Sequence, residues 1–114
     1  MTDPLTIATE EMCDLLGFAE LRLRERFPGV RASVTIPGER PVRLHFAKHG
    51  TDWGLFVEAA DGQMLHVSKT GRDMRIRAAH VVSKLDDALA AENMAEMARV
   101  RAASQALKNF LETT

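Results

Sequence analysis

The sequence predicts an α+β fold: a four-stranded antiparallel meander sheet with an N-terminal helix and two C-terminal helices, which pack mainly on one face of the sheet. Apolar residues alternate with polar ones in short segments between residues 30 and 68, as in half-buried strands. Short runs of turn residues separate these segments, which favours pairing of strands that follow one another in the chain. The flanking regions carry apolar residues at helical spacing.

The composition limits the class of protein. The chain has 114 residues, so one domain spanning residues 1–114 is expected. Its net charge of −1 argues against bulk nucleic acid or an anionic membrane as the main partner. A single cysteine, Cys13, excludes an internal disulfide and a cysteine zinc site. Together with the lack of a signal peptide or membrane span, it favours a cytoplasmic location.

A first helix is expected over residues 3–27. Asp3 and Pro4 form a good helix start, and Pro28 and Gly29 a good end. The predicted apolar stripe comprises Met12, Leu15, Leu16, Ala19, Leu23 and Phe27.

Four strands are expected over residues 30–36, 42–47, 52–58 and 63–68. One face of their sheet is apolar and comprises Ala32, Val34, Ile36, Val42, Leu44, Phe46, Trp53, Leu55, Val57, Leu65 and Val67. Because this face must be buried, the helices should cover it.

The turns predict which residues face each other across the sheet. A loop at residues 48–51 pairs Ala47 with Asp52, Phe46 with Trp53, Leu44 with Leu55 and His45 with Gly54. A loop at residues 60–62, with Gly62 in the left-handed conformation, is typical of a three-residue hairpin. This second loop predicts the pairs Ala59–Gln63, Val57–Leu65, Phe56–Met64 and Gly54–His66.

Two helices are expected at the C-terminus. Thr70 and Asp73 resemble a capping box, which opens a helix running to about Ala91. Asn93 and Glu96 offer a second capping box, so we expect a tight bend near Glu92. The last helix carries an apolar stripe that packs either as a third core helix or against a second copy: Met94, Met97, Val100, Leu107, Phe110 and Leu111.

The outer sheet face, opposite the apolar one, holds the first candidate site. The predicted pairs gather Arg43, His45, Phe56, Met64 and His66 around Gly54. Aromatic, methionine and arginine side chains are enriched at interface cores, so these five form a candidate protein interface. The alternative is that a helix of this chain or of a second copy covers them as core.

A basic cluster near the start of the second helix is the second candidate. Its members are Lys69, Arg72, Arg75, Arg77 and His80, which could contact an anion such as a phosphate, or an acidic partner. Asp73, Asp86 and Asp87 dilute the positive charge, and a solvated helix face is the commoner meaning. An RNA-binding sheet would need more stacking rings than Phe56 alone.

Metal and catalytic chemistry are not expected. His45 and His66 could approach a shared ion, but a third ligand is not evident, so no metal or other cofactor is predicted. Cys13 with His49 or His80 could form a nucleophile and base, although a buried structural cysteine is commoner. The chain carries no recognisable catalytic motif, so an enzyme is the third choice.

The sequence therefore favours a small cytoplasmic binding or regulatory module that acts through protein contacts, as a homodimer or with another protein. Its size and lack of motifs also fit an accessory protein of a phage or mobile element. The alternative is a nucleic-acid-associated protein that uses the basic cluster.

Overall fold

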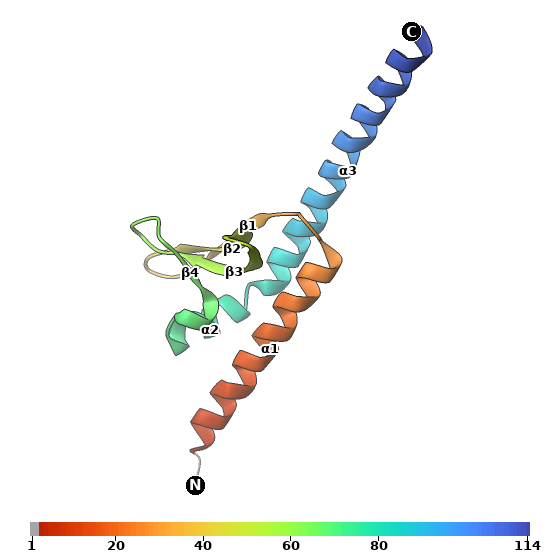
Figure 1. The fold of residues 1–114 in the computed structure, drawn as a ribbon. Coiled ribbons are helices and arrows are strands. Elements are labelled where there is room, and N and C mark those ends of the chain that lie inside the picture. Colours follow the sequence, from red (N-terminus) through yellow and green to blue (C-terminus); the bar gives the residue numbers. More distant parts are fainter. Residues whose placement is uncertain (1–2) are drawn as a thin grey trace.

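The structure, a computed structural model, describes residues 3–114. Figure 1 shows an N-terminal helix, a small sheet at the middle of the molecule, a short helix beside it and a long C-terminal helix. The sheet has four antiparallel strands in the order β1-β2-β3-β4, so each strand pairs with the next one in the chain. The predicted α+β meander with its flanking helices is confirmed.

Helix α1 spans Pro4–Arg26. Asp3 precedes it in an extended conformation, and Gly29, with a φ of 77°, lets the chain turn toward the sheet. Leu16 and Leu23 are buried, but Leu15 is 58% exposed, so its place in the predicted stripe is wrong. Leu15 is one residue, or about 100° of rotation, away from Leu16 and therefore faces away from the core.

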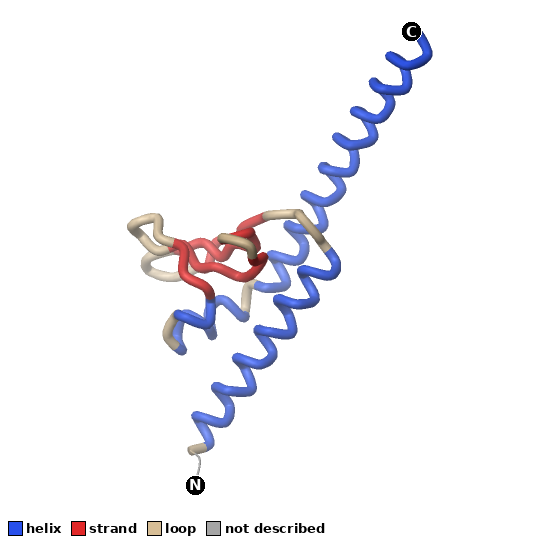
Figure 2. Tube along the Cα trace, in the orientation of Figure 1, coloured by secondary structure: helices blue, strands red, loops and turns tan. Residues whose placement is uncertain are grey.

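The strands are β1 (Ala32–Ile36), β2 (Val42–His49), β3 (Asp52–Glu58) and β4 (Met64–His66). Their inner face forms the core with α1 and the first turns of the last helix. Leu65 is the exception to the predicted inner face, because it is 38% exposed on the short last strand. Figure 2 shows both long helices on one side of the sheet.

The predicted turn between β2 and β3 is wrong by two residues. His49 pairs with Asp52, which leaves only Gly50 and Thr51 in the turn. Gly50 has a φ of 68°, as the first central residue of a type II′ turn requires. The glycine therefore lets pairing continue through Lys48 and His49. Every pair predicted across this turn is shifted as a result, including Ala47–Asp52, Phe46–Trp53, Leu44–Leu55 and His45–Gly54.

The turn between β3 and β4 is confirmed. Gly62 has a φ of 85°, and the Ala59 N–H donates to the Gln63 carbonyl at 2.8 Å. The Val57–Leu65 pair is also confirmed, but the predicted pairs Phe56–Met64 and Gly54–His66 are wrong. In an antiparallel ladder a step forward on one strand is a step back on the other, so Phe56 faces His66.

The C-terminal helices divide at a different place from the predicted one. A 3₁₀ turn, η1 (Val67–Lys69), leads into α2 (Arg72–Ala79), and α3 runs unbroken through Val82–Thr113. The break lies at His80 and Val81, where the Val81 side chain is buried. The predicted bend near Glu92 is absent from α3, because neither glycine nor proline interrupts residues 82–113.

The predicted capping residues of these helices have other roles. The Thr70 hydroxyl donates to the Val67 carbonyl at 2.6 Å, and Gly71 is the residue before α2. Asn93 and Glu96 lie inside α3, where neither can cap a helix start.

The molecule is elongated, with extents of 73 × 29 × 24 Å. Its radius of gyration is 18.2 Å, whereas about 13 Å is typical of a compact chain of this length. Both long helices extend beyond the sheet, in opposite directions (Figure 1), and residues 94–114 at the end of α3 are all exposed. Figure 1 shows this segment projecting well beyond the sheet, and we call residues 94–113 the stalk.

Candidate functional site

The outer sheet face brings together the five residues of the first candidate site, in two adjacent rows. His45, Phe56 and His66 form one row across β2, β3 and β4. Arg43 and Met64 belong to the next row, where each faces Glu58. Gly54 lies opposite Ala47 and not between the two imidazoles as predicted.

Phe56 is enclosed by its neighbours on the outer face. The ring is only 6% exposed, and the His49 and His66 rings lie with their centroids 5.4 Å from its own. The aromatic member of the candidate interface is thus already buried within one chain. Binding at this face would use the surrounding polar groups, and it stays a prediction.

Arg43 and His45 have polar neighbours on the same face. Arg43 donates to the Ser33 hydroxyl at 2.7 Å and to the Thr35 hydroxyl at 3.2 Å on β1. His45 Nε2 lies 3.2 Å from Glu58 Oε1, but their geometry is not that of a hydrogen bond. These contacts hold both side chains close to the sheet.

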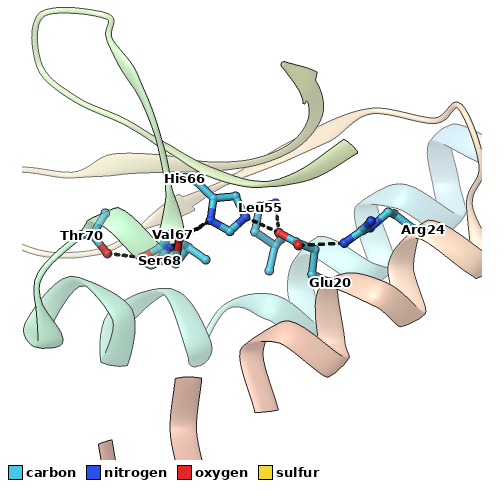
Figure 3. Close-up of polar contacts among 7 residues, drawn as sticks. All are labelled: Glu20, Arg24, Leu55, His66, Val67, Ser68 and Thr70. Carbon is cyan, nitrogen blue, oxygen red and sulfur yellow. Dashed lines mark hydrogen bonds and ion pairs between the residues drawn. The ribbon is translucent and has the colours of Figure 1, made fainter. Parts of the chain in front are cut away.

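A buried carboxylate at the sheet edge is the polar centre of the fold, and Figure 3 shows its contacts. Glu20 of α1 is only 9% exposed. Its Oε2 accepts the Leu55 N–H at 2.8 Å and lies 2.7 Å from His66 Nε2, while Arg24 donates to Oε1 at 3.0 Å. Glu20 therefore links α1 to both β3 and β4.

The backbone explains why this carboxylate is needed. Strand β4 ends at His66, so the neighbouring part of β3 has no β4 partner, and Glu20 accepts the Leu55 N–H there. Gly54 makes room for it, because a Cβ at that position would lie 2.8 Å from Glu20 Oε2. The absence of a side chain at Gly54 therefore admits the carboxylate.

His66 is fixed from both sides. Its Nδ1 accepts the Ser68 N–H at 3.2 Å and lies 2.7 Å from the Ser68 hydroxyl. A neutral ring with Nδ1 as acceptor carries its proton on Nε2 and donates it to Glu20. The imidazole thus caps η1 and ties it to α1.

Serine, histidine and glutamate in a chain of hydrogen bonds are also the groups of a hydrolytic relay. Catalysis would further require donors aimed at a developing oxyanion. The backbone N–H groups of Ser68 and Thr70 are already bonded to His66 Nδ1 and to the Val67 carbonyl. The arrangement therefore fits a structural clamp better than an active site.

Glu20 is not among the predicted site residues, although its spacing along α1 indicates a buried position. Leu16, Glu20, Leu23 and Phe27 follow a spacing of four, three and four residues, which places Glu20 on the buried stripe of α1. A carboxylate on such a stripe needs buried donors, and a strand end supplies one.

A cavity of about 180 Å³ adjoins this clamp. Its lining includes Cys13, Glu20, His66, Ser68 and Arg75. Arg75 donates to the Cys13 sulfur at 2.8 Å and to the Thr70 carbonyl at 3.1 Å, so it holds α2 against α1.

The basic cluster is divided by such contacts. Arg77 donates to the Pro37 carbonyl at 2.8 Å in the turn between β1 and β2, whereas Arg75 faces α1. Lys69, Arg72 and His80 are exposed. Of the four lysine and arginine side chains in the cluster, Arg75 and Arg77 therefore already donate to backbone or sulfur acceptors. An anion-binding role for the cluster stays a prediction.

Apolar side chains gather on the exposed parts of both long helices. On the stalk, the exposed fractions are 56% for Val100, 63% for Leu107 and 68% for Leu111. We define the stalk stripe as Met97, Val100, Leu107, Phe110 and Leu111. On α1, Leu5, Ile7, Leu15 and Phe18 are about half exposed or more.

Within residues 3–114, no group of three or more His, Cys, Asp or Glu side chains lies close enough to hold a metal ion. No helix in the same range combines the length and the apolarity that a membrane crossing requires. Comparisons of the chain with known protein families, with curated proteins and with solved structures find no match.

Proposed function

We propose that this chain is a non-enzymatic binding module that acts through protein–protein contacts made by its helices. The observation that supports this most is the stalk stripe. It continues the face of α3 that buries Leu85 and Leu89 against the core, but beyond the sheet the same face meets solvent. A contiguous exposed apolar surface of this kind is typical of an interaction site.

Helix energetics support the same proposal. The stalk has about five turns of helix, and every one of its residues is exposed. In proteins most of the stability of a helix comes from tertiary packing of its apolar face, and the exposed apolar face of the stalk lacks such packing. Burying each exposed leucine would contribute about 1.5–3 kcal/mol, so a partner would stabilise the stalk.

Binding experiments with matched variants test this function. Leu107→Ser with Leu111→Ser removes apolar surface from the stalk stripe, whereas Gln105→Ser with Asn109→Ser changes the polar side of the same turns. Each protein would be immobilised and exposed to extract of the native host and, separately, to labelled copies of itself. We expect the native chain to bind either a host protein or a second copy of itself. The Leu107→Ser, Leu111→Ser variant should lose this binding, and the Gln105→Ser, Asn109→Ser variant should keep it.

Equal binding by all three proteins would contradict the proposed use of the stalk. Circular dichroism would confirm that each variant keeps its helices, since all four substituted side chains are exposed.

A further inference from the structure

We propose that two copies pair reciprocally, with the stalk of each copy lying antiparallel along the first half of α1 in the other. This inference rests on the proposed function and names its partner as a second copy. Figure 1 shows the geometric basis: the first half of α1 and the stalk project from the central body in opposite directions. A two-fold axis across the long dimension would place each stalk beside the partner's α1, twice in one dimer.

The exposed area is large enough for such a dimer. The chain exposes 7985 Å², whereas a monomeric protein of 12.6 kDa exposes about 6,200 Å². The excess of about 1,800 Å² is roughly twice the 800 Å² that each partner buries in a standard interface. A reciprocal arrangement would cover both projecting segments.

Both surfaces are apolar. An apolar groove of about 360 Å³ runs between α1 and the junction of α2 with α3. Its lining includes Ala8, Met12, Leu15, Leu16, Ala79 and Val82. The stalk offers side chains for this groove at helical spacing, and its alanines allow two helices to come close.

Charge favours α1 over a second stalk as the binding surface. Residues 3–15 carry four acidic and no basic side chains, and residues 97–111 carry three basic and no acidic ones. Among the ion pairs of residues 3–114, none involves Glu10, Glu11 or Asp14, nor Arg101 or Lys108. Arg99 is already paired with Glu92 and Glu96. Two stalks side by side would bring Arg101 and Lys108 of both copies together, whereas a stalk against α1 would place these two side chains near acidic ones. The antiparallel direction also suits the helix dipoles.

Charge reversal tests this arrangement on the full chain. The first variant is Arg101→Glu with Lys108→Glu, the second is Glu10→Lys with Glu11→Lys, and the third combines all four changes. Sedimentation equilibrium from about 1 to 100 μM protein would give each dimer dissociation constant. We expect a dimer for the native chain, a dissociation constant raised about tenfold in the first and second variants, and recovery in the third.

The outcomes separate this proposal from the function on which it rests. If the native chain stays monomeric at 100 μM, the proposal that a second copy is the partner is overturned. The proposed function would still stand if a protein from the host extract binds the native chain but not the Leu107→Ser, Leu111→Ser variant. A dimer weakened by the first variant but not restored by the third would overturn the contact with α1 and indicate pairing of two stalks. A dimer unaffected by any of the reversals would place the interface elsewhere and overturn the proposal.

Discussion

Glu20 is the residue on which the polar connection between α1 and the sheet depends. A buried carboxylate is costly unless donors surround it. Here the Leu55 amide, His66 and Arg24 supply them from a strand, a strand end and the same helix. Removing the carboxylate would leave the Leu55 N–H without its acceptor.

We therefore expect Glu20→Ala to lower the free energy of unfolding by about 2–4 kcal/mol. Glu20→Gln should cost less, since one amide oxygen can still accept the Leu55 N–H. Urea unfolding followed by the fluorescence of Trp53 measures both. Glu25→Ala, at an exposed position of the same helix, is the control and should change stability by less than about 0.5 kcal/mol. Equal stability of the Glu20 and Glu25 variants would contradict the clamp.

Phe56 and Met64 are neighbours on the outer face but differ in burial. Because the Phe56 ring is enclosed, Phe56→Ala should cost about 3–5 kcal/mol in the same unfolding experiment. Met64 is half-buried, so Met64→Ala should cost about 1 kcal/mol. A stable Phe56 variant with weakened partner binding would instead favour the outer face as the interface.

At the scale of elements, α3 has two parts with different roles. Its first turns cover the sheet through Leu85 and Leu89, and its stalk leaves the body of the molecule. Glu92 and Glu96 both accept hydrogen bonds from Arg99 where the stalk begins. The hydrogen bonds that Arg99 donates to Glu96 and then to Glu92 raise the pKa of its guanidinium above the ordinary value.

The two parts should respond differently to the same substitution. Leu89 is fully buried, so Leu89→Ala should lower stability by about 2–5 kcal/mol at any protein concentration. Leu107 is 63% exposed, so Leu107→Ala should have almost no effect in dilute solution. Its cost should rise with protein concentration if the stalk is buried in a dimer. Thermal unfolding of both variants at about 1 and 100 μM protein would measure these losses of stability. A large loss for Leu107→Ala at the lower concentration would show that this side chain is buried within the single chain, contrary to the structure.

At the scale of the whole molecule, shape and charge are arranged along one axis. Acidic side chains concentrate at the start of α1, whereas residues 97–111 of the stalk carry basic side chains and no acidic ones; the two segments lie at opposite ends of a molecule 73 Å long (Figure 1). The net charge of −1 hides this separation. Exposed apolar side chains at both ends of the elongated chain are of the kind found at partner interfaces.

Much of the fold could be predicted because it depends on local patterns. Alternation predicted the strands and the inner face of the sheet, and Gly62 predicted the hairpin between β3 and β4. The turn at Gly50 was predicted with two residues too many, because Lys48 and His49 are polar and resemble loop residues. The candidate-site residues still lie together on the outer face, because a shift of two residues keeps every side chain on the same face of the sheet.

The order of the helices and strands, the meander and the apolar face of the sheet follow from spacing along a few residues, so the amino-acid pattern alone predicts them. Long-range packing sets three other features: the point where α3 leaves the core, the enclosure of Phe56, and the role of Glu20 as acceptor for the Leu55 amide. These features depend on contacts between residues far apart in the chain, such as Glu20 and His66, and no local period encodes such contacts.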